Sequence, residues 1–131
     1  MQIIEVPRDD LWFLVRSESG PGHYSVDLRG RNGNGECTCI DFATRAPQAE
    51  RVGRVHQCKH IEACSVYVYF RHLRRMMDAL ADFRRTPRAV RPAGYDNECA
   101  RLSKAIEDFR AIPQATARQA LINFHIANQQ R

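Results

Sequence analysis

Residues 37–60 read CTCIDFATRAPQAERVGRVHQCKH, and this stretch decides how the rest of the chain is interpreted. It opens with Cys37 and Cys39, one residue apart, and closes with Cys58 and His60 at the same spacing. Eighteen residues lie between the two pairs. Sulfur and nitrogen ligands in two close pairs are the set that a structural zinc ion takes in tetrahedral coordination. The sequence therefore predicts a zinc site here.

The chain before the first cysteine pair has the pattern of short β-strands separated by turns. Residues 3–6 and 11–15 are rich in aromatic and β-branched side chains, which favour strands. Residues 23–28 alternate apolar and polar side chains, as a half-buried strand does. Glycine-rich turns are expected at residues 19–22 and 30–35.

The first cysteine pair is expected on a further strand, residues 36–42. Side chains two residues apart on a strand point to the same side, so the sulfurs of Cys37 and Cys39 would lie together. Residues 43–57 contain a proline and a glycine, and we expect them to form a long loop.

A helical period begins at Ile61 and continues to Arg84. This predicts one amphipathic helix of about 35 Å, with Cys58 and His60 in its lead-in and first turn. Its apolar stripe consists of Ala63, Val66, Phe70, Leu73, Met77 and Leu80, and it is widened by Tyr69, Met76 and Phe83. Pro87 ends the pattern.

The remainder of the chain is predicted to be helical. A linker at residues 86–94 leads to helices at 96–111 and 114–128, which we expect to form a helical hairpin or a bend within residues 95–130. The predicted fold class is α+β, a small antiparallel β-meander joined by zinc to a long helix and followed by a helical extension. The expected units are residues 1–68, a zinc-binding module, and residues 69–131, the extension.

The ligand pairs and their surroundings resemble the SWIM-type zinc finger over residues 10–68. The features that carry the resemblance are Tyr24-x-Val26, Cys39-Ile-Asp-Phe42 and Cys58-Lys-His60-Ile61. The resemblance implies a zinc ion held by Cys37, Cys39, Cys58 and His60. It also implies a module that binds DNA or protein, because SWIM fingers occur in transposases, remodelling ATPases and ubiquitin-ligase adaptors.

Alternatives to this ligand set stay open. His56 lies two residues before Cys58 and can pair with it, although the resemblance favours His60. Cys64 follows His60 by one helical turn and can face the metal, while a small core side chain is the simpler interpretation. An iron–sulfur cluster uses similar ligands, and unligated buried cysteines need no metal.

Four protein ligands leave no coordination position for a reactive water, which argues against catalysis by the metal. The sequence has no nucleophile elbow, phosphate-binding loop or dinucleotide fingerprint. We therefore expect that the protein is not an enzyme. The sequence begins without a secretory signal and has no membrane-spanning apolar run, so we expect an intracellular protein of the cytoplasm, nucleoid or nucleus.

The distribution of charged residues along the chain suggests what class of partner it binds. The net charge is +5, and residues 71–91 carry seven arginines against two aspartates. Because the arginine side chain binds phosphate through its planar fork, we expect binding to nucleic acid, most simply DNA. The candidate contacts are Arg71, Arg74, Arg75, Arg84, Arg85 and Arg88. The alternative is a protein-interaction adaptor or inhibitor that uses its amphipathic helices, with a homodimer through the C-terminal helices as one form of it.

Overall fold

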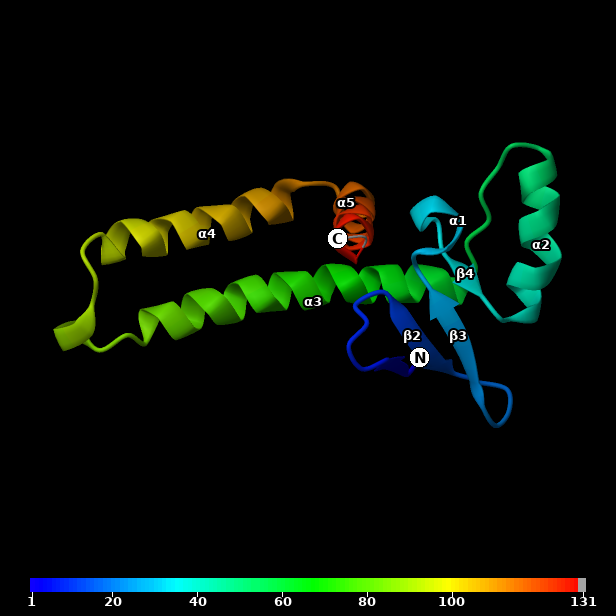
Figure 1. Ribbon diagram of the computed structural model, residues 1–131, viewed down its shortest axis with the longest axis horizontal. Helices are drawn as coiled ribbons and strands as arrows, with labels where there is room; N and C mark the ends of the chain where they lie inside the picture. The colour runs from blue at the N-terminus through cyan, green and yellow to red at the C-terminus, as the bar shows by residue number, and fades with distance from the viewer. Residues whose placement is uncertain (130–131) are drawn as a thin grey trace.

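A long helix, α3 (Lys59–Arg84), forms the spine of the molecule (Figure 1). The computed structural model describes residues 1–129, so residues 130–131 of the expected extension lie outside the described part. A β-sheet packs against the N-terminal half of α3, and the C-terminal half runs on beside α4 (Tyr95–Ala111). The fold is α+β, as the sequence predicted.

The sheet is a four-stranded antiparallel meander in sequence order. Its strands are β1 (Ile3–Glu5), β2 (Trp12–Arg16), β3 (His23–Asp27) and β4 (Glu36–Cys37). The period-two alternation puts Phe13, Val15 and Val26 on the face that α3 covers, where all three are fully buried. This register also aligns Cys37 with Val26, so the first predicted metal ligand faces the same core.

The turn between β3 and β4 is tight, as expected, although its helical segment α1 (Gly30–Gly33) contains left-handed residues. Arg31 and Asn32 have φ values of 54° and 61°. Gly35, with φ 93°, lies directly against α3, because a Cβ there would approach Ile61 Cγ2 to 2.8 Å. The turn therefore brings β4 onto the first turn of α3.

The expected strand at residues 36–42 is wrong beyond its first residues. Strand pairing stops at Cys37, and Cys39 becomes the N-cap of a helix, α2 (Ile40–Arg51), in which its sulfur accepts a hydrogen bond from the Phe42 N–H at 3.4 Å. The backbone stays extended across the junction because the Thr38 N–H still donates to the Ser25 carbonyl. The sulfurs of Cys37 and Cys39 therefore lie on one side, as predicted, although only Cys37 belongs to a strand.

The expected loop at residues 43–57 is mostly helix α2 as well. The helix contains Pro47 in its interior, and Ala46 is its one buried residue. The end of α2 does have a sequence signal, which is Gly53. This glycine adopts φ 71°, and the Arg54 N–H donates to the Ala49 carbonyl. This glycine-terminated arrangement is a common helix C-terminus.

The C-terminal helices pack on α3 rather than on each other. A short helical turn, η1 (Arg88–Val90), leads into α4, which runs antiparallel to α3. Helix α5 (Gln114–Gln129) crosses α3 near the sheet and places Ile122 in the core. The expected hairpin within residues 95–130 is therefore a bend at Pro113, because the apolar faces of both helices are used against α3.

The expected boundary between residues 68 and 69 lies inside α3, with no break in the helix. Ile122 also shares its core with Phe13 and Val68, so both parts of the chain contribute to one core. Among the described residues, no helix combines the length and apolarity that crossing a lipid bilayer requires.

Candidate metal centre

The two ligand pairs of the sequence converge on one buried point. The ligand atoms of Cys37, Cys39, Cys58 and His60 all lie within 4.8 Å of one another, and all four residues are buried. They come from β4, the N-cap of α2, the N-cap of α3 and the first turn of α3. A metal ion at this point would cross-link three elements that are otherwise joined only through loops and core packing.

The spacing of the ligand atoms fits zinc. Zinc bonds of about 2.3 Å to sulfur and 2.05 Å to nitrogen, at a tetrahedral angle, separate sulfur from nitrogen by roughly 3.6 Å. The His60 Nδ1 atom lies 3.7 Å from Cys37 Sγ and 3.9 Å from Cys58 Sγ. The three sulfurs and one nitrogen can therefore hold a metal ion, with His60 binding through Nδ1.

The three thiols of the ligand group have pKa values shifted in different directions. The pKa of the Cys58 thiol is lowered to about 5, chiefly because the Cys37 thiol donates a hydrogen bond to it, with help from the His60 and Ile61 N–H groups. The same contact, together with burial, raises the pKa of Cys37, and burial raises that of Cys39. Because metal binding needs thiolates, it has to release the protons that the thiols with raised pKa values still carry.

The neighbouring candidates lie outside the ligand group. His56 Nε2 contacts Asp41 Oδ2 at 2.8 Å, and this contact lowers the pKa of Asp41. Cys64 is fully buried in the core, where burial raises the pKa of its thiol to about 12. Cys99 is half-buried on α4. The structure thus places His60 in the ligand group and His56 outside it. The sequence alone had left the choice between these two histidines open.

The two histidines give a matched test of the ligand set. We expect His60→Ala to lower zinc affinity by more than about 100-fold, because it removes a direct ligand. His56→Ala leaves all four ligands in place and is expected to lower the affinity by less than about tenfold. Competition with a chromophoric chelator measures both affinities. Equal losses in the two variants would contradict this ligand set.

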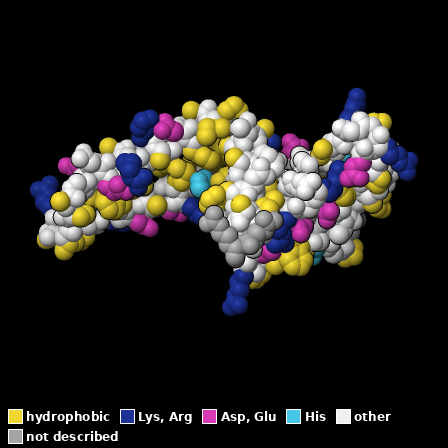
Figure 2. Space-filling model, turned by 45° about the horizontal axis from the view of Figure 1, so that its top comes forward, with side chains coloured by type: hydrophobic (Ala, Val, Ile, Leu, Met, Phe, Trp, Pro, Cys, Tyr) yellow, Lys and Arg dark blue, Asp and Glu magenta, His cyan; other side chains and the backbone are white. Residues whose placement is uncertain are grey.

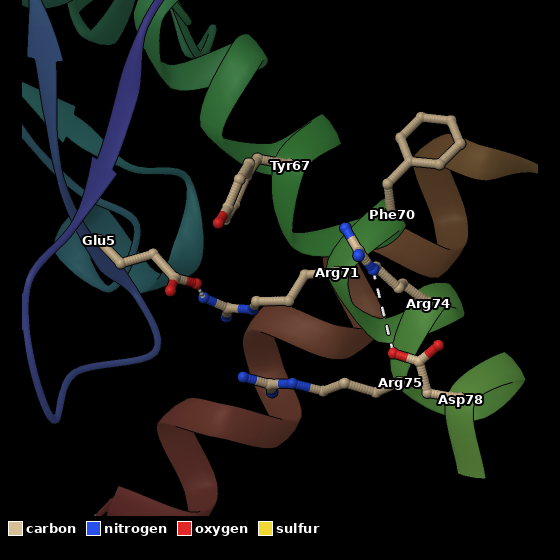
Figure 3. Close-up of a pocket in the computed structure, with 7 residues that line it drawn as sticks. All are labelled: Glu5, Tyr67, Phe70, Arg71, Arg74, Arg75 and Asp78. Atoms are coloured by element: carbon tan, nitrogen blue, oxygen red, sulfur yellow. Dashed lines mark hydrogen bonds and ion pairs between the residues drawn. The ribbon is translucent and has the colours of Figure 1, made fainter. Parts of the chain in front are cut away.

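Arg71, the first candidate nucleic-acid contact, is occupied inside the molecule. Its Nη1 lies 2.7 Å from Glu5 Oε1 and its Nη2 donates to the Asp10 carbonyl at 2.6 Å. Figure 3 shows the guanidinium pointing at Glu5, and only 9% of the side chain is exposed. The guanidinium also lies over the Phe13 ring at 5.6 Å. Contrary to the expectation, this arginine fastens α3 to the sheet and is not available to a phosphate.

The other candidate arginines fall into two groups instead of one ridge. Arg74 and Arg75 lie beside Arg71 and have acidic neighbours at 3.9 Å, Asp78 and Asp10 respectively. The hollow that they line, about 340 Å³, also contains Glu5, so its charge is mixed (Figure 3). Basic side chains are likewise scattered over the face shown in Figure 2.

The second group forms what we call the arginine tip, defined as Arg84, Arg85, Arg88 and Arg91. Asp82 is the only acidic residue between positions 79 and 95, and it pairs with Arg85 at 2.7 Å. The tip lies at the free end of the α3–α4 arm (Figure 1). Arg91 packs over the Tyr95 ring at 4.4 Å and donates to the Thr86 carbonyl, which fixes the turn.

Sequence reasoning missed one residue that supports the site. Arg31 pairs with Glu50 at 2.8 Å and lies 5.1 Å from the Phe42 ring, so it holds α2 against the β3–β4 turn. The left-handed backbone of Arg31 is visible only in the structure. Nothing in the local sequence pattern predicts its role.

Comparison of the chain with family models, curated proteins and solved structures found no significant match. The ligand group itself therefore indicates the chemistry of the site. Three buried cysteines and one buried histidine, with their ligand atoms gathered at one point, form a group that can hold a metal ion. This arrangement is consistent with a zinc finger.

Proposed function

We propose that the protein is a non-enzymatic zinc-binding module of the SWIM type. The observation that carries the proposal is the convergence of Cys37, Cys39, Cys58 and His60 within 4.8 Å, from three different elements. When bound, the zinc supplies a structural cross-link. Because the protein provides all four ligands, the site has no position for a reactive water. Recognition then depends on the surfaces that the site holds in place.

We further propose that the arginine tip binds nucleic acid, as an accessory factor in DNA transactions. Four arginines within eight residues, with one acidic neighbour, favour contact with the phosphate backbone over reading of the bases. The tip protrudes from the rest of the molecule, so a duplex can approach it without meeting the sheet (Figure 1). The Phe83 ring on α3 stacks on the Tyr95 ring on α4 at 5.1 Å, and this contact holds the two helices together at the tip.

A salt titration tests this second proposal. Double-stranded DNA and single-stranded RNA probes are titrated with zinc-loaded protein, and fluorescence anisotropy gives the affinity at several salt concentrations. The slope of log K against log salt is about −0.9 for each phosphate neutralised on duplex DNA. The double variant Arg84→Ala/Arg88→Ala is therefore expected to flatten the slope by about 1.8 on duplex DNA.

The control is Arg16→Ala/Arg51→Ala, which removes the same charge from exposed positions at the end of β2 and the end of α2, away from the tip. It is expected to leave the slope unchanged. Absence of salt-dependent binding to either probe, or equal effects of the two double variants, would reject the nucleic-acid proposal. Such a result would leave the zinc-binding proposal intact, because the chelator competition on His60 tests it separately.

A further inference from the structure

The apolar stripe of α3 is only partly covered within the molecule, because Leu80 is buried whereas Phe70 and Met77 are about half exposed. Helix α3 turns Ile61, Cys64 and Val68 toward the sheet. The expected stripe lies on another side of the helix, and there Phe70 is 52% and Met77 49% exposed. Figure 3 shows the Phe70 ring pointing away from Glu5 and the sheet. Two large apolar side chains seven residues apart, on one face of one helix, thus lie in water.

The α3–α4 arm also lacks a second packing layer. Helix α4, every residue of which the structure describes, buries none of them. It is held to α3 along one side, where Tyr69 stacks on Phe109 at 5.0 Å. The open side has a groove of about 420 Å³ that both helices line. Its wall consists of Met77, Leu80, Ala81, Arg84, Ser103, Ile106, Glu107 and Arg110. Antiparallel helix pairs with one apolar face open are completed in four-helix bundles by a second pair.

We propose that the second pair is another copy of this chain, packed antiparallel against the Phe70–Met77 face of α3. A two-fold interface needs a surface that complements itself. Arg74 and Asp78 meet this need, because they have opposite charges, lie on the same flank of the stripe and are 3.9 Å apart within one chain. A two-fold axis that crosses α3 near residue 75 brings Arg74 of each copy within reach of Asp78 of the other.

The same axis pairs the apolar residues. Leu73 of one copy lies level with Met77 of the other, and Phe70 lies level with Leu80, next to Ala81, so the two exposed side chains are covered. If a partner carried charges of only one sign on the facing side, either Arg74 or Asp78 would lie opposite a like charge. The alternating charges of this flank therefore favour a second copy over such a partner.

The dimer has a consequence for the arginine tips, which rests on the proposed function. Arg85 lies ten residues from the axis, so the two tips would be separated by about 30 Å along α3 at 1.5 Å per residue. This is close to one turn of B-form DNA, about 34 Å. The dimer itself does not depend on nucleic-acid binding, and its test uses none.

Sedimentation equilibrium of the zinc-loaded full-length chain tests the proposal. The wild-type protein is expected to be a dimer at micromolar concentrations. Phe70→Glu/Met77→Glu is expected to raise the dimer dissociation constant by at least about tenfold, because it places charge at the centre of the interface. The control Ala79→Glu adds a charge at an exposed position on another side of α3 and is expected to leave the dimer intact. Circular dichroism and zinc content confirm that each variant is folded.

Exchanging the charges of Arg74 and Asp78 tests the proposed register of the two α3 helices. Arg74→Asp alone is expected to weaken the dimer, and Arg74→Asp/Asp78→Arg to restore it. A monomeric wild-type protein, a dimer insensitive to the Phe70 and Met77 substitutions, or a dimer equally weakened by Ala79→Glu would overturn the proposal. So would failure of the charge exchange to restore association. A monomer that uses Phe70 to capture a different protein would likewise assign this face to another partner.

Discussion

Cys39→Ser is expected to unfold the half of the molecule that contains the sheet. Cys39 is both a member of the proposed ligand group and the N-cap of α2, so its loss would remove the cross-link and a helix cap together. Structural zinc sites contribute about 10 kcal/mol or more of apparent binding energy, which is comparable with the whole stability of a small domain. Thermal unfolding followed by circular dichroism should show a melting temperature lower by well over 10 °C.

Cys99→Ser is the matched control. It makes the same chemical change at a half-buried cysteine on α4, away from the ligand group, and is expected to retain both zinc and melting temperature. Strong chelator added to the wild-type protein should reproduce the Cys39→Ser result. If the chelated protein melted at the temperature of the zinc-loaded protein, the metal would have no structural role.

Arg71→Ala is expected to cost about 3 kcal/mol of unfolding free energy. The guanidinium is almost fully covered, and its removal leaves the Glu5 carboxylate and the Asp10 carbonyl without their donors. Breaking a buried ion pair from one side costs about 3–5 kcal/mol, and the 43% exposure of the Glu5 side chain places this pair at the lower end. The lost packing over the Phe13 ring adds to the effect.

Arg75→Ala is the control, with the same substitution four residues along α3. Its side chain is 58% exposed, so the free energy of urea unfolding is expected to change by no more than about 0.5 kcal/mol. The pair thus separates structural arginines from surface arginines of one helix. Equal stabilities of the two variants, with nucleic-acid binding lost only in Arg71→Ala, would show that Arg71 contacts a ligand.

The Arg71 effect should depend on pH. The hydrogen bond from Arg71 is the main cause that lowers the pKa of Glu5 in the folded protein. A lowered folded pKa contributes stability that is complete above the unfolded pKa, about 4.3, and is lost as the pH falls through the folded value. The difference in unfolding free energy between wild type and Arg71→Ala should therefore be constant from pH 5 to 7 and shrink at lower pH.

The sequence predicted those features that depend on spacing along the chain. The strands, the β3–β4 turn and α3 follow from periods of two and of three to four residues, and the ends of α3 follow from Cys58 and Pro87. Helix α2 was missed because it packs on the molecule through few side chains and contains Pro47, so its pattern resembles a loop. Gly53 is the one local signal that marks its end.

By itself, the sequence determined which four residues can bind a metal and which segments are helices or strands. Only the tertiary structure decided which arginines are exposed, which histidine lies in the ligand group and which apolar side chains of α3 stay exposed. The physical reason is that these properties depend on partners far away in the chain. Glu5 and Arg71 are separated by 66 residues and meet only because α3 packs on the sheet. The same packing leaves Phe70 on the outside, where the helical period alone had predicted a core.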